Sequence, residues 1–130
     1  MGLLLTLTAI ILSVTTLWLG LLYTLATRIF TIRFNEINRY FYDVAVSIDQ
    51  LGNVIMRDLF NQILITSESP HNFGDEDEVI SSVLGKNQQT HTLTGLGKFL
   101  VRFLNFLDPN HTLNSIEQRE KEIGNTVSND

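Results

Sequence analysis

The chain begins with an almost unbroken apolar segment. No Asp, Glu, Lys or Arg precedes Arg28. A helix over residues 3–23 would be about 32 Å long at about 1.5 Å per residue, close to the roughly 30 Å hydrocarbon core of a bilayer. A chain of 130 residues is too short to enclose a helix that is apolar on every side. We therefore predict a transmembrane anchor over residues 1–30. A cleaved signal peptide fits less well, because no basic region precedes the apolar run.

The pattern then changes to apolar residues at alternating spacings of three and four. This spacing is typical of an amphipathic helix, and it predicts one over residues 31–65 that is continuous with the anchor. The positions that form this amphipathic seam are Phe34, Ile37, Phe41, Val44, Ile48, Leu51 and Ile55. The seam could pair with a second copy of the chain, or it could pack on the chain's own helices over residues 79–84 and 99–107.

Short helices are predicted over the remaining chain. Residues 66–74 (TSESPHNFG) have the composition of a loop. Asp75, with Glu78 three residues later, is predicted to cap a helix that ends at Gly85. Further helices are expected over residues 98–107 and 112–123, and residues 124–130 are expected to be disordered. The predicted fold is all-α, with residues 66–123 forming a small helical region packed on the long amphipathic helix.

Charge distribution predicts an orientation in the membrane. The chain has a net charge of −5, yet residues 28–42 carry +2 because Arg28, Arg33 and Arg39 outnumber one Glu. The positive-inside rule then places the N-terminus outside and the C-terminal region in the cytoplasm. A basic stripe long enough for nucleic acid is lacking, so no nucleic-acid partner is predicted.

Candidate catalytic and metal sites are weak. The chain has no Cys and only three His, which removes thiolate zinc sites and Cys nucleophiles. The acidic run at residues 75–78 lacks the alternation of a calcium loop and suits a helix N-terminus better. Asp49, Asp58, Glu78 and His111 could in principle meet in one site, but no catalytic motif accompanies them. We predict no enzymatic activity, cofactor or metal.

Small residues recur along one side of the anchor. The positions predicted to support helix association are Ser13, Thr16, Gly20, Thr24 and Thr27. Small side chains let two helices approach closely in lipid, which predicts a homo-oligomer. In the alternative interpretation, the hydroxyl groups only bond to the preceding turn of their own helix.

The segment at residues 98–107 (KFLVRFLNFL) is unusually apolar. It could form the core of the small helical region. It could instead lie in the membrane interface, with Phe99, Phe103 and Phe106 inserted and with Lys98 and Arg102 near anionic head groups. The sequence leaves both interpretations open.

An ordered set of polar residues extends over about residues 46–117. It has the form DQxxN, then GxxDExIS, then DPxHxxxSIE, and its polar members are Asp49, Gln50, Asn53, Asp77, Glu78, Ser81, His111 and Ser115. This set resembles a group of short, functionally uncharacterised proteins of bacteriophages and prophages of Gram-negative bacteria. The resemblance implies a viral origin. Many of those proteins have a Cys after the His, where this chain has Thr112, so a shared Cys/His metal role is not expected.

Together these features predict a phage-encoded, single-pass accessory or interaction protein at the host inner membrane. Such a protein would act in lysis control, superinfection exclusion or host takeover. Its expected partners are the lipid bilayer, further copies of itself, and a phage or host membrane protein. The alternatives are a structural protein of a virion or its membrane, and a small hydrolytic enzyme.

Overall fold

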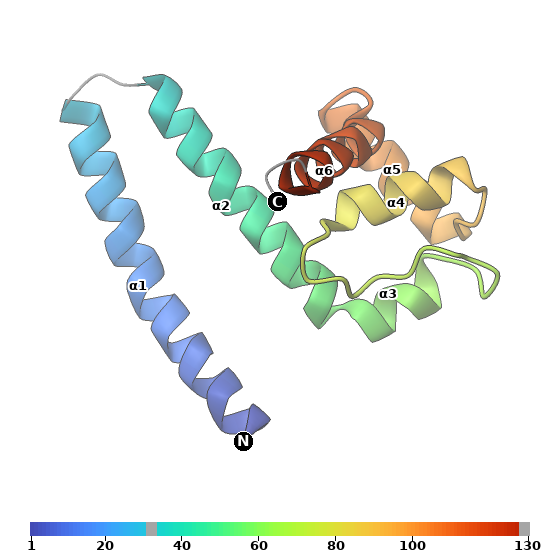
Figure 1. Cartoon of the computed structure of the whole chain (residues 1–130), viewed down its shortest axis with the longest axis horizontal. Coiled ribbons are helices and arrows are strands. Elements are labelled where there is room, and N and C mark those ends of the chain that lie inside the picture. Colours follow the sequence, from blue (N-terminus) through green and yellow to red (C-terminus); the bar gives the residue numbers. More distant parts are fainter. Residues whose placement is uncertain (31–33, 128–130) are drawn as a thin grey trace. The chain divides into compact units, whose positions relative to one another are not determined.

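The computed structural model describes residues 1–30 and 34–127, without the side chains of residues 29, 30, 34, 117–119, 122, 123 and 125–127. Its elements are all helices: α1 (Gly2–Phe30), α2 (Phe34–Ile55), α3 (Arg57–Ile63), α4 (Ile80–Gln89), α5 (Gly95–Leu107) and α6 (His111–Val127) (Figure 1). Within these residues the only β-type pairing is an isolated antiparallel bridge between Ile65 and Leu93. The prediction of an all-α chain with a long N-terminal helix and shorter helices after it is confirmed.

Helix α1 is long and apolar enough to cross a membrane. No residue in its membrane-length stretch is buried inside the protein. Its hydroxyl groups donate hydrogen bonds within the helix: Thr16 Oγ1 lies 2.7 Å from the carbonyl oxygen of Leu12, and Thr27 Oγ1 lies 2.9 Å from that of Tyr23. These bonds satisfy the two hydroxyl groups within the helix itself, which suits an apolar environment.

The chain divides into two compact units, Met1–Val44 and Ala45–Asp130, and α2 runs through the boundary between them. In the second unit, α4 packs on both α5 and α6. Residues 81–85 of α4 are all buried, which makes this helix the centre of the unit. The apolar core consists of Leu64, Ile65, Phe73, Val83, Leu84, Leu93 and Val101.

Two glycines allow close backbone packing in this unit. A Cβ atom on Gly85 would clash with the carbonyl oxygen of Thr112 at the start of α6. A Cβ atom on Gly97 would clash with the carbonyl oxygen of Leu64. Both glycines therefore set the distance at which helices α4 and α5 pack on their neighbours.

Several predicted helix boundaries differ from the structure. The helix expected over residues 31–65 is two helices, since α2 ends at Ile55 and α3 begins at Arg57. The predicted continuity with α1 concerns residues 31–33, which lie outside the described residues. Helix α6 continues to Val127, past its predicted end.

The prediction that Asp75 caps the fourth helix is wrong. Helix α4 begins at Ile80, with Val79 as the N-cap residue. Asp75 forms a local turn instead, in which its Oδ1 accepts a hydrogen bond of 3.0 Å from the backbone nitrogen of Asp77. The stop predicted at Gly85 is also wrong, because α4 passes through this buried glycine and ends at Gln89.

Candidate functional site

Polar residues from three segments meet where α2 joins the rest of the second unit. We call this cluster the polar junction: Asp49, Gln50 and Asn53 of α2, Glu78 of the preceding loop, and Ser81, Ser82 and Lys86 of α4. Six of these seven side chains form hydrogen bonds within the cluster or to the backbone of the loop before α4. The seventh, Lys86, forms an ion pair with Glu78. The junction thus contains every member of the ordered polar set that precedes α5, apart from Asp77.

Asn53 is the centre of the junction and is fully buried. Its Nδ2 donates to the carbonyl oxygens of Asp75 at 2.9 Å and Glu78 at 2.7 Å. Its Oδ1 accepts a hydrogen bond of 3.1 Å from the backbone nitrogen of Gly74. One side chain therefore satisfies three backbone groups of the loop before α4, and only an amide supplies both donors and an acceptor here.

Asp49 belongs to α2, but its side chain lies beside the N-terminus of α4. Its Oδ2 accepts a hydrogen bond of 3.2 Å from the Ser81 hydroxyl. Burial raises the pKa of Asp49 above its ordinary value, against the opposing effects of hydrogen bonds from Ser81 and from the backbone of Ile80, and of the charge on His111. A carboxylate at this place satisfies N–H groups of the first helical turn and interacts favourably with the helix dipole. Asp49 thus acts as a cap supplied from a distant helix.

Glu78, which is buried, forms an ion pair with the half-buried Lys86 of α4. Lys86 Nζ lies 2.5 Å from Glu78 Oε1, and the Ser82 hydroxyl donates to the same oxygen at 2.6 Å. Only 7% of the Glu78 surface is exposed. The pair stabilises the start of α4, because Glu78 lies beside the helix N-terminus while its charge is compensated by Lys86.

The remaining members of the ordered polar set lie around this cluster. Gln50 donates a hydrogen bond of 3.1 Å to the carbonyl oxygen of Asp77, whose side chain is exposed. His111 begins α6 and pairs with Asp108 at 2.9 Å. Ser115 donates to the carbonyl oxygen of His111 at 2.8 Å. Asp77 therefore contributes backbone only, while Ser115 serves its own helix.

The junction has the properties of a structural connection. Ser81 is only 4% exposed and its hydroxyl is donated to Asp49, so a substrate would have to displace the first turn of α4 to reach it. Among the residues that the structure describes, no three His, Asp or Glu side chains are grouped as metal ligands would be. The carboxylates, hydroxyls and two amides of the junction bond to one another and to the backbone around them.

A second buried amide was not predicted from the sequence. Asn87 is fully buried in α4. Its Nδ2 donates to the carbonyl oxygens of His71 at 2.8 Å and Val83 at 2.9 Å, and its Oδ1 accepts from Ser69 and Thr92. It ties the loop before α4 to the turn after it. The local sequence is polar and suggests an exposed loop, so only the spacing from Val83 could have indicated a helical position.

Helix α2 is attached through its polar side and exposes its apolar side. The buried Asn53 and the half-buried Asp49 face the junction. On the opposite side, Ile48 and Leu51 are each 59% exposed and Ile55 is 69% exposed. We call these three residues the α2 ridge. The predicted seam therefore does not pack on α4 or α5 at these positions. Ile37 and Val44 are half-buried and Phe41 is exposed, while the Phe34 side chain lies outside the described part.

Helix α5 also exposes an apolar surface, which we call the α5 face: Leu96, Phe99, Phe103, Phe106 and Leu107. The other side of the helix is packed, with Gly97 and Val101 buried and with Leu100 and Leu104 against the core. The two interpretations left open for this segment are therefore not exclusive. One side forms core, and the aromatic side remains exposed.

Comparison with protein-family models, with curated proteins and with solved structures finds no match to this chain. The resemblance to phage proteins stays a prediction. Functional inference for this protein therefore depends on its surfaces and on the arrangement of its helices.

Proposed function

We propose that this protein is a membrane-anchored interaction protein that self-associates along α2. The observation that carries the proposal is the inverted attachment of α2, with its polar side in the protein and its apolar ridge exposed. A helix in a soluble unit normally buries its apolar side. Such a surface on an anchored unit marks an interaction site. The resemblance of the polar pattern to phage proteins supports a role at the inner membrane of an infected bacterium.

A second copy of the chain is the partner that the ridge fits best. Ile48, Leu51 and Ile55 continue the alternating spacing of a coiled-coil seam. Fully burying one such side chain contributes roughly 1.5–3 kcal/mol, so three ridge residues from each of two chains supply a substantial gain. Anchoring both chains in one membrane raises their effective concentration, which further favours pairing.

The anchor supports the same assembly. The hydroxyl groups of Thr16 and Thr27 already bond within α1, so this side of the helix needs no polar partner. Gly20 is the position that would allow two backbones to approach closely. We expect Gly20→Ile to weaken self-association of the chain in a membrane two-hybrid assay, whereas Leu21→Ile, away from the small side chains, should not. Equal signals from both variants would remove the anchor from the interface.

Cysteine cross-linking tests the ridge directly, because the chain has no natural Cys. In a parallel pair, identical ridge positions face each other, so Leu51→Cys in the full chain in liposomes should form a disulfide dimer under mild oxidation. Asp58→Cys is the matched control, since its side chain is 93% exposed but lies on α3. Equal cross-linking at the two positions, or none at Leu51, would refute association along α2.

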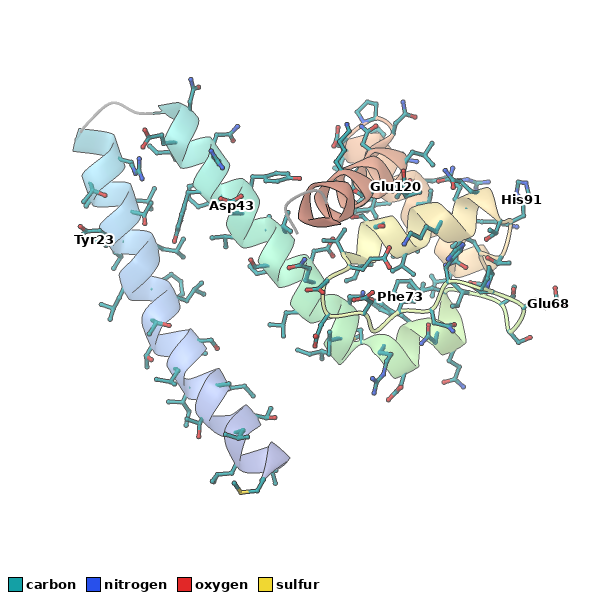
Figure 2. The ribbon with its side chains drawn as sticks, in the orientation of Figure 1. Tyr23, Asp43, Glu68, Phe73, His91 and Glu120 are labelled. Atoms are coloured by element: carbon teal, nitrogen blue, oxygen red, sulfur yellow. The ribbon has the colours of Figure 1, made fainter. Side chains whose placement is uncertain are left out.

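The orientation of the chain in the membrane can be tested with a single cysteine at an exposed position. We propose that the C-terminal region is cytoplasmic, on the basis of the arginines after the anchor. Ser82 would be a poor labelling site, because it is fully buried against Glu78. Glu68 is exposed and lies at the outer end of the loop between α3 and α4 (Figure 2). A membrane-impermeant thiol reagent should label Glu68→Cys only after the inner membrane is opened. Labelling of this cysteine in intact spheroplasts would show that the C-terminal region lies outside the cytoplasm.

A further inference from the structure

The α5 face is a strongly exposed apolar surface of the second unit. Phe106 is 83% exposed, and Phe99 and Leu107 are each 64% exposed. The opposite side of α5 packs closely, with Gly97 against the backbone of Leu64. The aromatic side is therefore the side that the folded unit leaves exposed.

The charge beside this face is opposite to that of the unit that carries it. Residues 45–130 contain twelve acidic and six basic residues, yet α5 carries Lys98 and Arg102 and no acidic residue. Lys98 and Arg102 are four residues apart, and each directly precedes an aromatic residue of the face. Helical geometry therefore places both cations along one border of the aromatic surface. Both cationic side chains are exposed.

We propose that α5 lies in the head-group region of the membrane that holds α1, with its aromatic face inserted and with Lys98 and Arg102 bound to anionic lipid. This inference builds on the proposed membrane anchoring. A helix with an aromatic side bordered by basic residues binds lipid through apolar burial together with attraction to anionic head groups. The long basic side chains can lie along the apolar surface while their charges reach the phosphates.

A bilayer suits this face better than a second copy of the chain. If two α5 faces met, neither helix would offer an acidic partner to Lys98 and Arg102 of the other, because α5 carries no acidic residue. The α2 ridge has no such basic border, which is why we assign the two surfaces to different partners. A single bilayer can accept both the anchor and α5.

Spin labels on single cysteines in the full chain test the inference. The chain is reconstituted in liposomes of phosphatidylcholine, with or without phosphatidylglycerol, and each label's accessibility to oxygen and to a nickel chelate is measured. With anionic lipid, a label on Phe103→Cys should be accessible to oxygen and protected from nickel. A label on Glu68→Cys, on an exposed loop, should show the opposite. Neutralising both cations, Lys98→Gln with Arg102→Gln, should reduce the nickel protection at position 103 to the level seen without phosphatidylglycerol.

A label on Leu12→Cys, in the middle of α1, separates the two proposals. If this label is in lipid while the label at position 103 is open to nickel in both membranes, α5 is not interfacial and the inference is wrong, although the anchor stands. If the Leu12 label is open to nickel, the proposed anchoring itself fails. If the label at position 103 is protected from nickel without contacting lipid, and if it shows dipolar coupling to another label, a second copy of the chain covers the face. That result would overturn the lipid assignment.

Discussion

Asn53→Asp is a nearly isosteric change that tests the polar junction. It preserves the acceptor for the backbone nitrogen of Gly74 but replaces the amide donor that now reaches the carbonyl oxygens of Asp75 and Glu78. The carboxylate oxygen would face two carbonyl oxygens at hydrogen-bond distance in a fully buried place. The substitution therefore removes two hydrogen bonds and introduces electrostatic repulsion without changing the shape of the side chain.

The expected loss is large for a small helical unit. Each buried carbonyl left without a donor costs about 1–3 kcal/mol, and a buried charge without a partner adds to that cost. We expect the free energy of unfolding to fall by about 3–5 kcal/mol, a large fraction of the 5–15 kcal/mol that is typical of a domain. A protonated carboxyl can donate one hydrogen bond, so the loss should shrink at low pH.

Asn61→Asp is the matched control. Asn61 Nδ2 donates only to the carbonyl oxygen of Phe73 at 3.1 Å, and its Oδ1 accepts from the backbone nitrogen of the same residue at 2.7 Å. This half-buried position loses one donor, so we expect a cost of about 1 kcal/mol. Thermal unfolding of the full chain in mild detergent, followed by circular dichroism at several pH values, measures both variants. Equal, small losses for the two variants would refute the central role assigned to Asn53.

Three further predictions concern α4 and α5. Gly85→Ala should lower the free energy of unfolding by about 1–3 kcal/mol in the same assay, because the new Cβ would meet the backbone of Thr112. Gly95→Ala, where the space is open, is the control and should be neutral or slightly stabilising. Equal effects of the two variants would contradict the close approach of α4 and α6. Thr94→Ala should lower the free energy of unfolding by about 1 kcal/mol, because the Thr94 side chain caps α5 by accepting a hydrogen bond from the backbone nitrogen of Gly97. An unchanged free energy would show that this cap is not needed. Because the pKa of Asp49 is raised in the folded protein, the unfolded chain loses this proton first as pH rises. The stability of the wild type relative to Asp49→Asn should therefore fall with rising pH between the ordinary pKa and the raised pKa of this carboxyl. A stability difference that does not depend on pH would refute the raised pKa of Asp49.

Features that depend on local sequence were predictable. The apolar run of α1 predicts a helix of membrane length because no charged side chain interrupts it before Arg28. The helix over residues 98–107 was placed close to its observed bounds, since a continuous apolar stretch ends at Asp108 and Pro109. The alternating apolar spacing of α2 likewise predicts a helix with one apolar side. It does not say which side faces the rest of the protein.

Only the tertiary structure decides that question, because the deciding contacts join residues far apart in the chain. Asn53 bonds to Asp75 and Glu78, 22 and 25 residues away. Asp49 bonds to Ser81, 32 residues away, and caps a helix whose own N-cap residue, Val79, has no side-chain oxygen. The local sequence at Asp75 suggests an earlier helix start, but these distant contacts hold the loop in another conformation. The same contacts bury the polar side of α2, and Ile48, Leu51 and Ile55 on its apolar side are left exposed.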